Sequence, residues 1–333
     1  MFMLTTKLLI KTKSKSYSII VGNQILETTG SLIKKNFSNI NKIAIITDKN
    51  LPSLILKKIK KSLNEFELII IKLPSGEKIK NIKVATKIIN KLLKKNFNRS
   101  DCVIALGGGV IGDLSGFVSS LIKRGVRFVN IPTTLLAQVD ASVGGKTAVN
   151  SNYGKNLIGV FYQPDLVIAD TSVLKLLPKR EIVSGYAEIL KHSLILDRKF
   201  FFWLSKMGEK ILIERDNASL KKAIIRSCKI KASVVSIDEN EKNFRMILNF
   251  GHTFGHSFER VTNFSKKLNH GEGVLLGMLM ATQISYKKKL LKLEDLKLIQ
   301  KHYNNFDLPK DVKKYFKKNQ VNSIIKFMRN DKK

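Results

Sequence analysis

Three of the five histidines in the chain, His252, His256 and His270, lie within nineteen residues. His252 and His256 are four residues apart, so a helix would place both imidazoles on one face, a common geometry for zinc. Farther upstream, Glu188 and Lys191 are spaced to occupy neighbouring positions on another helix. Two imidazoles and a carboxylate that leave one coordination position open are typical of catalytic zinc. The pattern predicts a metal site; the spacing alone favours His252 and His256, and it does not decide which two histidines bind.

A glycine-rich loop, Gly107–Asp113, follows an apolar run and precedes an amphipathic segment. It satisfies the pattern G-x-G-x-x-G, in which glycines let the backbone approach a pyrophosphate at a helix N-terminus. A tight turn that needs glycine for positive φ is the alternative, but four glycines in six positions exceed what a turn requires. We therefore predict nucleotide binding, with Asp48 at the end of the first predicted strand accepting from ribose or adenine groups. In the usual dinucleotide fold this loop follows the first strand, whereas here it follows the third.

A second polar region covers residues 132–147 and continues at Gly154–Asn156. Its small residues and its lysines, Lys146 and Lys155, are predicted to lie in loops after a strand, where backbone N–H and ammonium groups suit a phosphate. A flexible surface loop is the alternative. The region resembles the end of a P-loop, but Asp140 stands where the leading glycine belongs, which excludes an NTPase motif.

The elements that must position these residues follow from the hydrophobic spacing. Buried strands are predicted at Lys42–Thr47, Glu67–Lys72, Cys102–Leu106 and Phe128–Ile131. Helical patterns alternate with them, which indicates a parallel sheet covered on both faces. After about residue 178 only helical patterns follow, at Arg180–Leu196, Phe200–Ile213, Leu220–Ser236, His252–Val261, Gly273–Lys289 and Glu294–Tyr303. We expect a Rossmann-like α/β domain at residues 1–178 and an all-α domain at residues 179–333.

The formal net charge of +34 invites a nucleic-acid interpretation, which we reject. Only ten of the 60 basic residues are arginine, the residue that nucleic-acid readers use for bidentate contacts, and the lysines are scattered along nearly every segment. The charge is interpreted instead as a compositional bias toward lysine that is spread over the whole chain. Two cysteines are too few for a disulfide framework, and no stretch reaches the ~18 apolar residues of a membrane span. We expect a cytoplasmic protein that binds neither nucleic acid nor membrane.

Taken together, the motifs resemble the 3-dehydroquinate synthase family of sugar phosphate cyclases. The resemblance runs from about Ile43 to the C-terminus and rests on seven stretches in order: Gly107–Asp113, Arg124–Phe128, Pro132–Lys146, Gly154–Asn156, Tyr186–Lys191, Asn249–His256 and His270–Glu272. It implies an NAD-binding α/β domain, a helical metal- and substrate-binding domain, a homodimer, NAD and one divalent metal, zinc or cobalt. It also implies conversion of 3-deoxy-D-arabino-heptulosonate 7-phosphate into 3-dehydroquinate and phosphate, in the shikimate pathway of aromatic amino acid biosynthesis. The family's route is transient NAD-dependent oxidation, phosphate β-elimination, reduction and intramolecular aldol closure.

The resemblance also assigns roles to residues. The metal ligands would be Glu188, His252 and His270, and His256 would contact the substrate instead of the metal. The coenzyme would contact Asp48, Ser75, Gly76, Glu77, Lys78, Ile79, Lys80, Gly109, Val110, Ile111, Gly112, Asp113, Thr133, Thr134, Lys146, Lys155, Val173, Leu174, Lys175 and Leu176. The substrate would contact Asp140, Lys146, Asn156, Lys191, Lys231, Arg245, Asn249 and His256. Arg124 would reach the phosphate of substrate bound to the neighbouring subunit.

Two departures from the family pattern accompany these assignments. Asp331–Lys333 resembles a family Asp-Lys-Lys motif whose first lysine, here Lys332, approaches the phosphate, but the family usually continues beyond it with a β-rich tail. Leu176 stands where the family often has a threonine beside the coenzyme.

The residues alone leave two other enzyme classes open. One is a zinc- or iron-dependent polyol dehydrogenase, which would need no phosphate-binding residues. The other is a sugar phosphate cyclase that acts on a different substrate.

Overall fold

The computed structural model describes residues 5–329 and 331, and contacts group the chain into two compact units. The first unit runs to Leu177 and also includes Leu220–Asn240. The second unit comprises Pro178–Ser219 and the chain from Glu241 onward. The sequence placed residues 220–240 with the helical part, whereas their contacts group them with the strands.

The first unit is built on a seven-stranded sheet in the order β1-β2-β9-β6-β5-β3-β4. All neighbouring pairs are parallel except β1 and β2, which are antiparallel. The nine strands of the described residues are β1 Thr6–Lys11, β2 Ser16–Gly22, β3 Lys42–Asp48, β4 Glu67–Leu73, β5 Cys102–Gly107, β6 Arg127–Pro132, β7 Lys146–Ser151, β8 Gly154–Phe161 and β9 Leu166–Asp170. The four predicted strands and the α/β class are confirmed; the antiparallel β1 makes the sheet mixed rather than wholly parallel.

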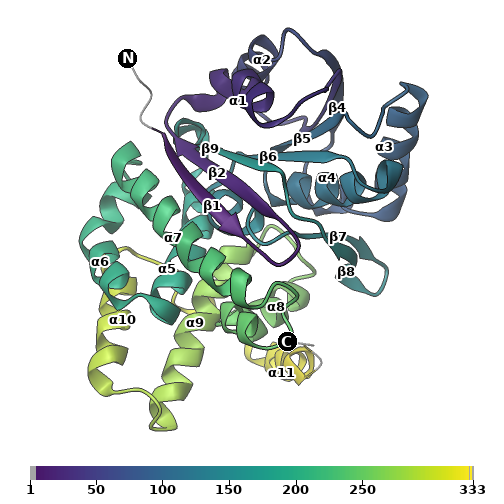
Figure 1. Cartoon of the computed structure of the whole chain (residues 1–333). Helices are drawn as coiled ribbons and strands as arrows, with labels where there is room; N and C mark the ends of the chain where they lie inside the picture. The colour runs from purple at the N-terminus through teal and green to yellow at the C-terminus, as the bar shows by residue number, and fades with distance from the viewer. Residues whose placement is uncertain (1–4, 330, 332–333) are drawn as a thin grey trace. The chain divides into compact units, whose positions relative to one another are not determined.

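Alternation along the central strands decides which helices pack on which face of the sheet. Ala44 and Ile46 of β3 and Val103 and Ala105 of β5 point to one face, where they join a core with α3 and α4. Figure 1 shows α1 and α2 on the opposite side of the sheet from α3 and α4. The helices are α1 Thr29–Asn36, α2 Ser53–Ser62, α3 Ile82–Lys94 and α4 Gly109–Leu121. The sheet is therefore covered on both faces, as the apolar strand sequences require.

The prediction that Lys146 and Lys155 lie in loops is wrong. Lys146 begins β7 and Lys155 lies in β8, and these two strands form an antiparallel hairpin outside the main sheet. The residues of β7 are mostly small or polar, and β8 has apolar residues only in its second half, without the alternation of a half-buried strand, so neither was recognised. A strand holds a lysine in a more defined place than a loop does.

The second unit consists of helices (Figure 1). The longer helices of residues 179–329 are α5 Lys179–Leu196, α6 Arg198–Leu212, α7 Asn217–Ile237, α8 His252–Val261, α9 His270–Lys287, α10 Leu293–Asn305 and α11 Val321–Arg329. Of these, α7 belongs mostly to the first unit. Short helical turns throughout the chain are η1 Ile25–Thr28, η2 Glu77–Ile79, η3 Ile122–Arg124, the π-turn η4 Ala137–Ala141, η5 Thr171–Leu176, η6 Phe244–Asn249, η7 Val312–Lys314 and η8 Lys318–Gln320. Among the described helices, none is both long enough and apolar enough to cross a bilayer.

His302 of α10 is buried in the helical unit. Its Nε2 lies 2.9 Å from the Tyr186 hydroxyl and its Nδ1 lies 3.0 Å from the Ser205 hydroxyl. Ser205 donates its own proton to the carbonyl oxygen of Phe201, so it accepts from Nδ1–H, and the Tyr186 hydroxyl donates to Nε2. The neutral imidazole is therefore satisfied on both sides, and burial lowers the pKa of His302 to about 4.

Acidification is expected to destabilise the protein through His302. The ordinary pKa of histidine is ~6.5, so between pH 6.5 and 4 the unfolded chain binds a proton that the folded chain excludes. This contribution to the free energy of unfolding is full above about pH 6.5 and falls by ~1–3 kcal/mol toward pH 4. Urea unfolding at pH 7 and pH 5 measures it. The variant His302→Gln should be less stable at pH 7 and lose less stability on acidification; an equal loss in both proteins would contradict the assignment.

Candidate active site

Three helices of the second unit each supply one side chain to a compact group. Glu188 lies within α5, His252 is the first residue of α8, and His270 is the first residue of α9. One ligand atom from each residue lies within 4.8 Å of the other two. The Nε2 atoms of His252 and His270 lie 3.7 and 3.8 Å from Oε1 of Glu188. These are the residue types and the number of protein ligands that a catalytic zinc site uses.

A glycine in the left-handed region starts the helix that carries His252. Gly251 precedes α8 with φ +80°, and a Cβ atom there would lie 2.7 Å from the backbone nitrogen of Met278. Only glycine tolerates both that φ and that approach. The backbone of α9 therefore passes directly beside the start of α8, which brings the two histidine-bearing helices together.

Glu188 fits a bound cation. Its side chain is fully buried, and Oε1 accepts no hydrogen bond from the described residues. Lys191, three residues later on the same helix, forms an ion pair with Oε2. Burial by itself would raise the pKa of Glu188, but the Lys191 ammonium and the two imidazoles hold that pKa well below its usual range. A buried carboxylate that stays ionised and faces two imidazoles is suited to a metal ion.

The two imidazoles of the group differ electrostatically. Burial lowers the pKa of His252 well below its usual range, and the Lys191 ammonium acts in the same direction. For His270 burial also lowers the pKa, but Glu259 and Glu188 outweigh it and raise the pKa to about 10. In the absence of a cation, His270 therefore carries the positive charge that balances the neighbouring carboxylates; a metal ion would take its place.

The ring of His256 lies beside this group, with its centroid 5.3 Å from that of His252, but His256 is not one of the three residues whose ligand atoms converge. Its Nδ1 lies 3.4 Å from Oδ2 of Asp331 instead. The spacing of four residues placed both imidazoles on one face of α8, but it carried no information about the helix opposite. The assignment of Glu188, His252 and His270 as ligands stays a proposal, which is argued below.

Close packing of α5 against α9 holds His270 in place. A Cβ atom on Gly271 would lie 2.3 Å from Cα of Ser184, and the Ser184 hydroxyl accepts from the Gly271 N–H at 3.2 Å. Asn269 caps α9, accepting from the backbone N–H of Glu272, whose carboxylate accepts from the N–H of Asn269. The start of α9 is therefore attached to the helix that carries Glu188.

An arginine from α5 adds a second attachment. The Arg180 guanidinium donates to both carboxylate oxygens of Glu272, at 2.6 Å each, and to the carbonyl oxygens of Lys266 and Lys267. Bidentate pairs of this kind fix geometry as well as adding energy. The sequence analysis named neither Arg180 nor Glu272 in a supporting role.

Two of the predicted substrate residues in the second unit are buried bases. Lys191 and Arg245 are 2% and 1% exposed. Asn249 donates to Oε1 of Glu241 at 3.0 Å. The sequence analysis did not assign a role to Glu241, and it also missed Glu239 of the first unit, which is buried and accepts from Gln163. Acidic residues in a turn are usually solvated, so their type and spacing gave no signal.

In the first unit the glycine loop joins β5 to α4 as predicted, and the alternative of a turn that needs positive φ is not what the structure shows. None of Gly107, Gly108, Gly109 and Gly112 has positive φ. A Cβ atom on Gly108 would lie 3.2 Å from Thr134, and one on Gly112 would lie 3.2 Å from the amide of Asn130. The glycines therefore allow close approach, at the helix N-terminus and against the next strand, as in dinucleotide-binding loops.

The loops after β5 and β6 lie side by side. The Thr133 N–H donates to the carbonyl oxygen of Gly107 at 2.9 Å, and the Thr134 hydroxyl accepts from Ala137. Carboxyl ends of parallel strands meet at one edge of the sheet, which is where ligands of open α/β sheets bind. Both predicted coenzyme loops are thus present at that edge.

A buried lysine gathers further predicted residues. Lys80 is 4% exposed, and its ammonium donates to Asp113 and to the side-chain oxygen of Asn156. Burial raises the pKa of Asp113, although Lys80 acts in the opposite direction. Asn150 links this group to the segment before α3 by donating to Glu77 at 2.8 Å. The structure therefore brings η2, α4 and the β7–β8 hairpin together.

Lys231 of α7 pairs with Asp140. Its ammonium lies 2.7 Å from Oδ1 and 2.6 Å from the backbone carbonyl oxygen of Asp140. Asp140 lies in the π-turn Ala137–Ala141, a form of helix that is frequent at functional sites. Two residues 91 positions apart, both predicted to contact substrate, are therefore in direct contact.

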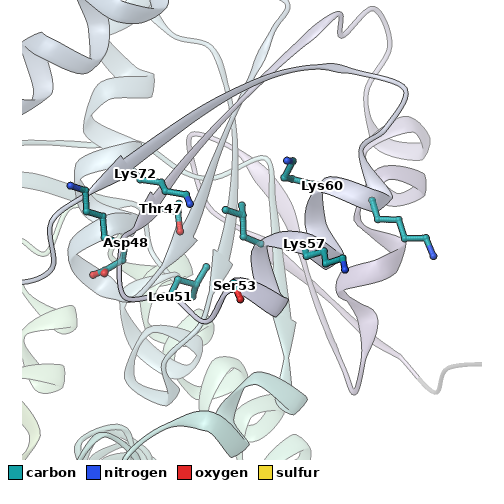
Figure 2. Close-up of a pocket in the computed structure, with 10 residues that line it drawn as sticks. Thr47, Asp48, Leu51, Ser53, Lys57, Lys60 and Lys72 are labelled. Atoms are coloured by element: carbon teal, nitrogen blue, oxygen red, sulfur yellow. The ribbon is translucent and has the colours of Figure 1, made fainter.

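A pocket of about 580 Å³ adjoins Asp48 at the carboxyl end of β3. Figure 2 shows Asp48 and Lys72 on one side of it and Lys57 and Lys60 of α2 on the other. The Asp48 carboxylate accepts from the Ser75 hydroxyl and from the backbone N–H of Asn50. Asp48 and Ser75, both predicted to contact the coenzyme, are thus neighbours.

The remaining predicted residues are more dispersed. Arg124 is exposed and has φ +61° in η3. Val173 and Leu174 are buried in η5, whereas Lys175 and Leu176 are exposed on it. Lys332 lies outside the described residues.

Comparisons with known proteins identify the family to which the chain belongs. The family model for the 3-dehydroquinate synthase N-terminal part matches residues 70–184, and the model for its C-terminal part matches residues 185–333. A 3-dehydroquinate synthase of Pelagibacter ubique (strain HTCC1062) is 51% identical over 327 residues, which cover 98% of this chain and 89% of the relative.

Solved structures resemble the chain in fold. A 2-deoxy-scyllo-inosose synthase complexed with carbaglucose-6-phosphate, NAD+ and Co2+ is 26% identical with a TM-score of 0.88, over 98% of this chain and 87% of the other. An iron-containing alcohol dehydrogenase from Thermococcus thioreducens has a TM-score of 0.73 at 13% identity, over 97% of this chain and 93% of the other, which is a likeness of fold alone.

Proposed function

The chain belongs to the 3-dehydroquinate synthase family, and we propose that it converts 3-deoxy-D-arabino-heptulosonate 7-phosphate into 3-dehydroquinate and phosphate. It would act as a phosphate-eliminating lyase in the shikimate pathway, which leads to aromatic amino acids. The observation that carries this proposal is the fully buried Glu188, which lies beside two imidazoles and forms an ion pair with the buried Lys191. A metal site next to a buried ammonium suits an anionic substrate.

NAD and one divalent metal, zinc or cobalt, are the proposed cofactors. The metal would be held by Glu188, His252 and His270, the group that the fold gathers on three helices. When bound, the two cofactors would supply a Lewis acid for the reacting hydroxyl group and a reversible acceptor of hydride. The cobalt- and NAD-bound synthase named above supports this pairing for a relative with the same fold.

The coenzyme is proposed to lie against the carboxyl edge of the sheet. The N-terminus of α4 would face its pyrophosphate, and the neighbouring Thr133–Thr134 loop would line the same place. Asp48, beside the lysine-lined pocket, would accept hydrogen bonds from the adenosine ribose (Figure 2). The buried Lys80 ammonium, which contacts both Asp113 and Asn156, would hold the end of the glycine loop Gly107–Asp113 in place.

The substrate is proposed to be held by basic residues. Lys146, Lys191, Arg245 and their neighbours would bind its carboxylate and phosphate, and Lys231 would reach it from the Asp140 pair. Holding one conformer throughout the sequence of steps contributes several kcal/mol, up to roughly 7–11 in well-oriented intramolecular reactions. Residues Asn156, Asn249 and His256 complete the proposed set.

Two further features belong to this proposal. A homodimer would let the exposed Arg124 reach the phosphate at the neighbouring subunit's site. A cytoplasmic location is supported by Cys102 and Cys228, which are both free and buried.

A coupled assay tests the function. The full chain, supplied with the heptulosonate phosphate, catalytic NAD+ and a divalent metal, should release phosphate while absorbance at the NADH band stays flat, because each turnover regenerates the coenzyme. Steady NADH accumulation would indicate a polyol dehydrogenase instead. Turnover of a hexose phosphate but not of the heptulosonate would assign the chain to another cyclase of the same fold.

A further inference from the structure

We propose that Glu259 is a positioning residue for the metal centre, which it serves by holding the imidazole of His270. This inference rests on the metal site of the proposed function. Glu259 is not among the metal-binding or substrate-binding residues proposed above, and neither its residue type nor its place after the histidine motif singled it out in the sequence.

Glu259 reaches His270 from the helix that carries the other histidine ligand. It lies on α8, seven residues after His252, so both side chains leave the same face of that helix two turns apart. Its residue is 7% exposed, and its Oε2 lies 3.3 Å from Nδ1 of His270. The opposite nitrogen, Nε2, lies 3.8 Å from Oε1 of Glu188. The imidazole of His270 is therefore held between two carboxylates, one at each nitrogen.

This arrangement fixes which nitrogen of His270 faces the metal position. A carboxylate at Nδ1 accepts the N–H there, so the lone pair of a neutral ring is left on Nε2, the nitrogen that points to Glu188. The ring also loses its freedom to turn over by rotation about χ2. Because histidine ligands commonly donate their second N–H to an oxygen, the geometry is the one that a ligand of a metal requires.

The other proposed histidine ligand shows the same pattern with a different oxygen. Nδ1 of His252 lies 3.3 Å from the backbone carbonyl oxygen of Phe250, and its Nε2 faces Glu188 at 3.7 Å. Both ligands thus have an oxygen at Nδ1 and Glu188 at Nε2. The carboxylate of Glu259 adds a full negative charge where His252 has only a carbonyl dipole, which strengthens the imidazole as a donor to a cation. Removal of the Glu259 charge should therefore lower the affinity for the metal more than removal of an uncharged hydrogen-bond acceptor would.

The test compares Zn2+ affinity in the metal-free full-length chain. Glu259→Gln keeps the shape and removes the charge, and it should lower the affinity ~10–100-fold in competition with a chromophoric chelator. Glu259→Asp keeps the charge on a shorter side chain and should recover part of the affinity. Glu209→Gln, an exposed site on α6, makes the same change of charge and should leave the affinity within twofold of the wild type.

A positioning role predicts two readouts that a structural role would not share. In Glu259→Gln, the rate of phosphate release should return most of the way to the wild-type value at saturating metal, because the defect lies in holding the metal. The visible absorption bands of the Co2+-loaded variant should shift from those of the wild type, and urea unfolding of the two metal-free proteins measures the loss of stability that must be subtracted from the loss of affinity. An unchanged Zn2+ affinity in Glu259→Gln would overturn the inference, as would lower affinity that is fully explained by a less stable metal-free protein.

The same titration separates this inference from the proposed function. If His270→Ala and Glu188→Gln lose Zn2+ and the Glu259 variants do not, only the positioning role fails. If the wild type and His270→Ala bind Zn2+ equally, the proposed metal site fails and Glu259 loses its role with it. If Glu259→Gln does not fold, Glu259→Asp tests the positioning role instead. Its carboxylate is drawn back by one methylene, so its Zn2+ affinity should still be lower than that of the wild type.

Discussion

Replacement of Glu188 by glutamine is expected to abolish stoichiometric metal binding and to lower the rate of phosphate release at least ~1,000-fold, or ~4 kcal/mol of transition-state stabilisation. Glutamine is nearly the same size but carries no negative charge, so the proposed site would keep two neutral imidazoles and lose its anionic ligand. Metal analysis after dialysis, together with initial rates at saturating NAD+, measures both effects.

The burial of Glu188 makes a second effect of the same substitution predictable. Lys191 is 2% exposed and has Glu188 as its ion-pair partner, so the variant leaves a buried ammonium without a carboxylate. Loss of one partner from a buried pair costs ~3–5 kcal/mol. The free energy of unfolding of Glu188→Gln should therefore fall by an amount of that order, as measured by urea unfolding of the metal-free protein.

A matched set of variants separates loss of metal from loss of fold. His270→Ala removes a proposed ligand and leaves the Glu188–Lys191 pair in place, so it should lose metal with a smaller change in stability. Glu209→Gln should leave both properties unchanged. Stoichiometric zinc in a folded Glu188→Gln protein would show that the ligand assignment is wrong.

Replacement of Gly271 by alanine is expected to destabilise the protein by ~3 kcal/mol or more, a cost typical of severe overpacking. The added Cβ would lie 2.3 Å from Cα and 2.4 Å from the carbonyl oxygen of Ser184. Both are backbone atoms in the middle of α5, so no flexible side chain can move aside. To relieve the clash α9 must shift away from α5, and His270 would shift away from Glu188. Zn2+ affinity should therefore fall together with stability.

Gly273 provides the control two residues farther along the same helix. A Cβ atom there would lie 3.4 Å from the carbonyl oxygen of Gly255, which is ordinary van der Waals contact. Alanine is favoured over glycine within a helix by up to ~1 kcal/mol, so Gly273→Ala should be neutral or slightly stabilising. Urea unfolding of the two variants and of the wild type tests the pair. Equal stability in Gly271→Ala and Gly273→Ala would contradict the close packing of α5 on α9.

The sequence predicted best those features that depend on neighbours along the chain. Hydrophobic periodicity placed the strands β3 to β6 and the helices α5 to α10, because burial of one face repeats with the geometry of each element. The glycine loop was also recognisable, since its glycines occupy fixed positions between a strand and a helix. The net charge of +34 did not indicate a function, because the lysines are spread along nearly every segment of the sequence.

Features without that periodicity were missed. Lys146 and Lys155 lie on the β7–β8 hairpin, whose strands lack the alternation of a half-buried strand. The strands β1 and β2, and the grouping of the predicted helix at Leu220–Ser236 with the first unit, depend on contacts with distant parts of the chain. Such contacts leave no regular pattern in a single sequence.

The metal centre shows most clearly where local information ends. The sequence by itself determined that histidines and a carboxylate are available, and the spacing of His252 and His256 put two rings on one face of a helix. Only the tertiary structure brought His270 of α9 and Glu188 of α5 to His252, left His256 beside Asp331, and placed Glu259 behind His270. The reason is geometric: spacing along one helix fixes the direction of its side chains, but a site with three ligands is made by the packing of three helices. That packing is set by contacts such as Gly271 against Ser184, between residues 87 positions apart in the chain.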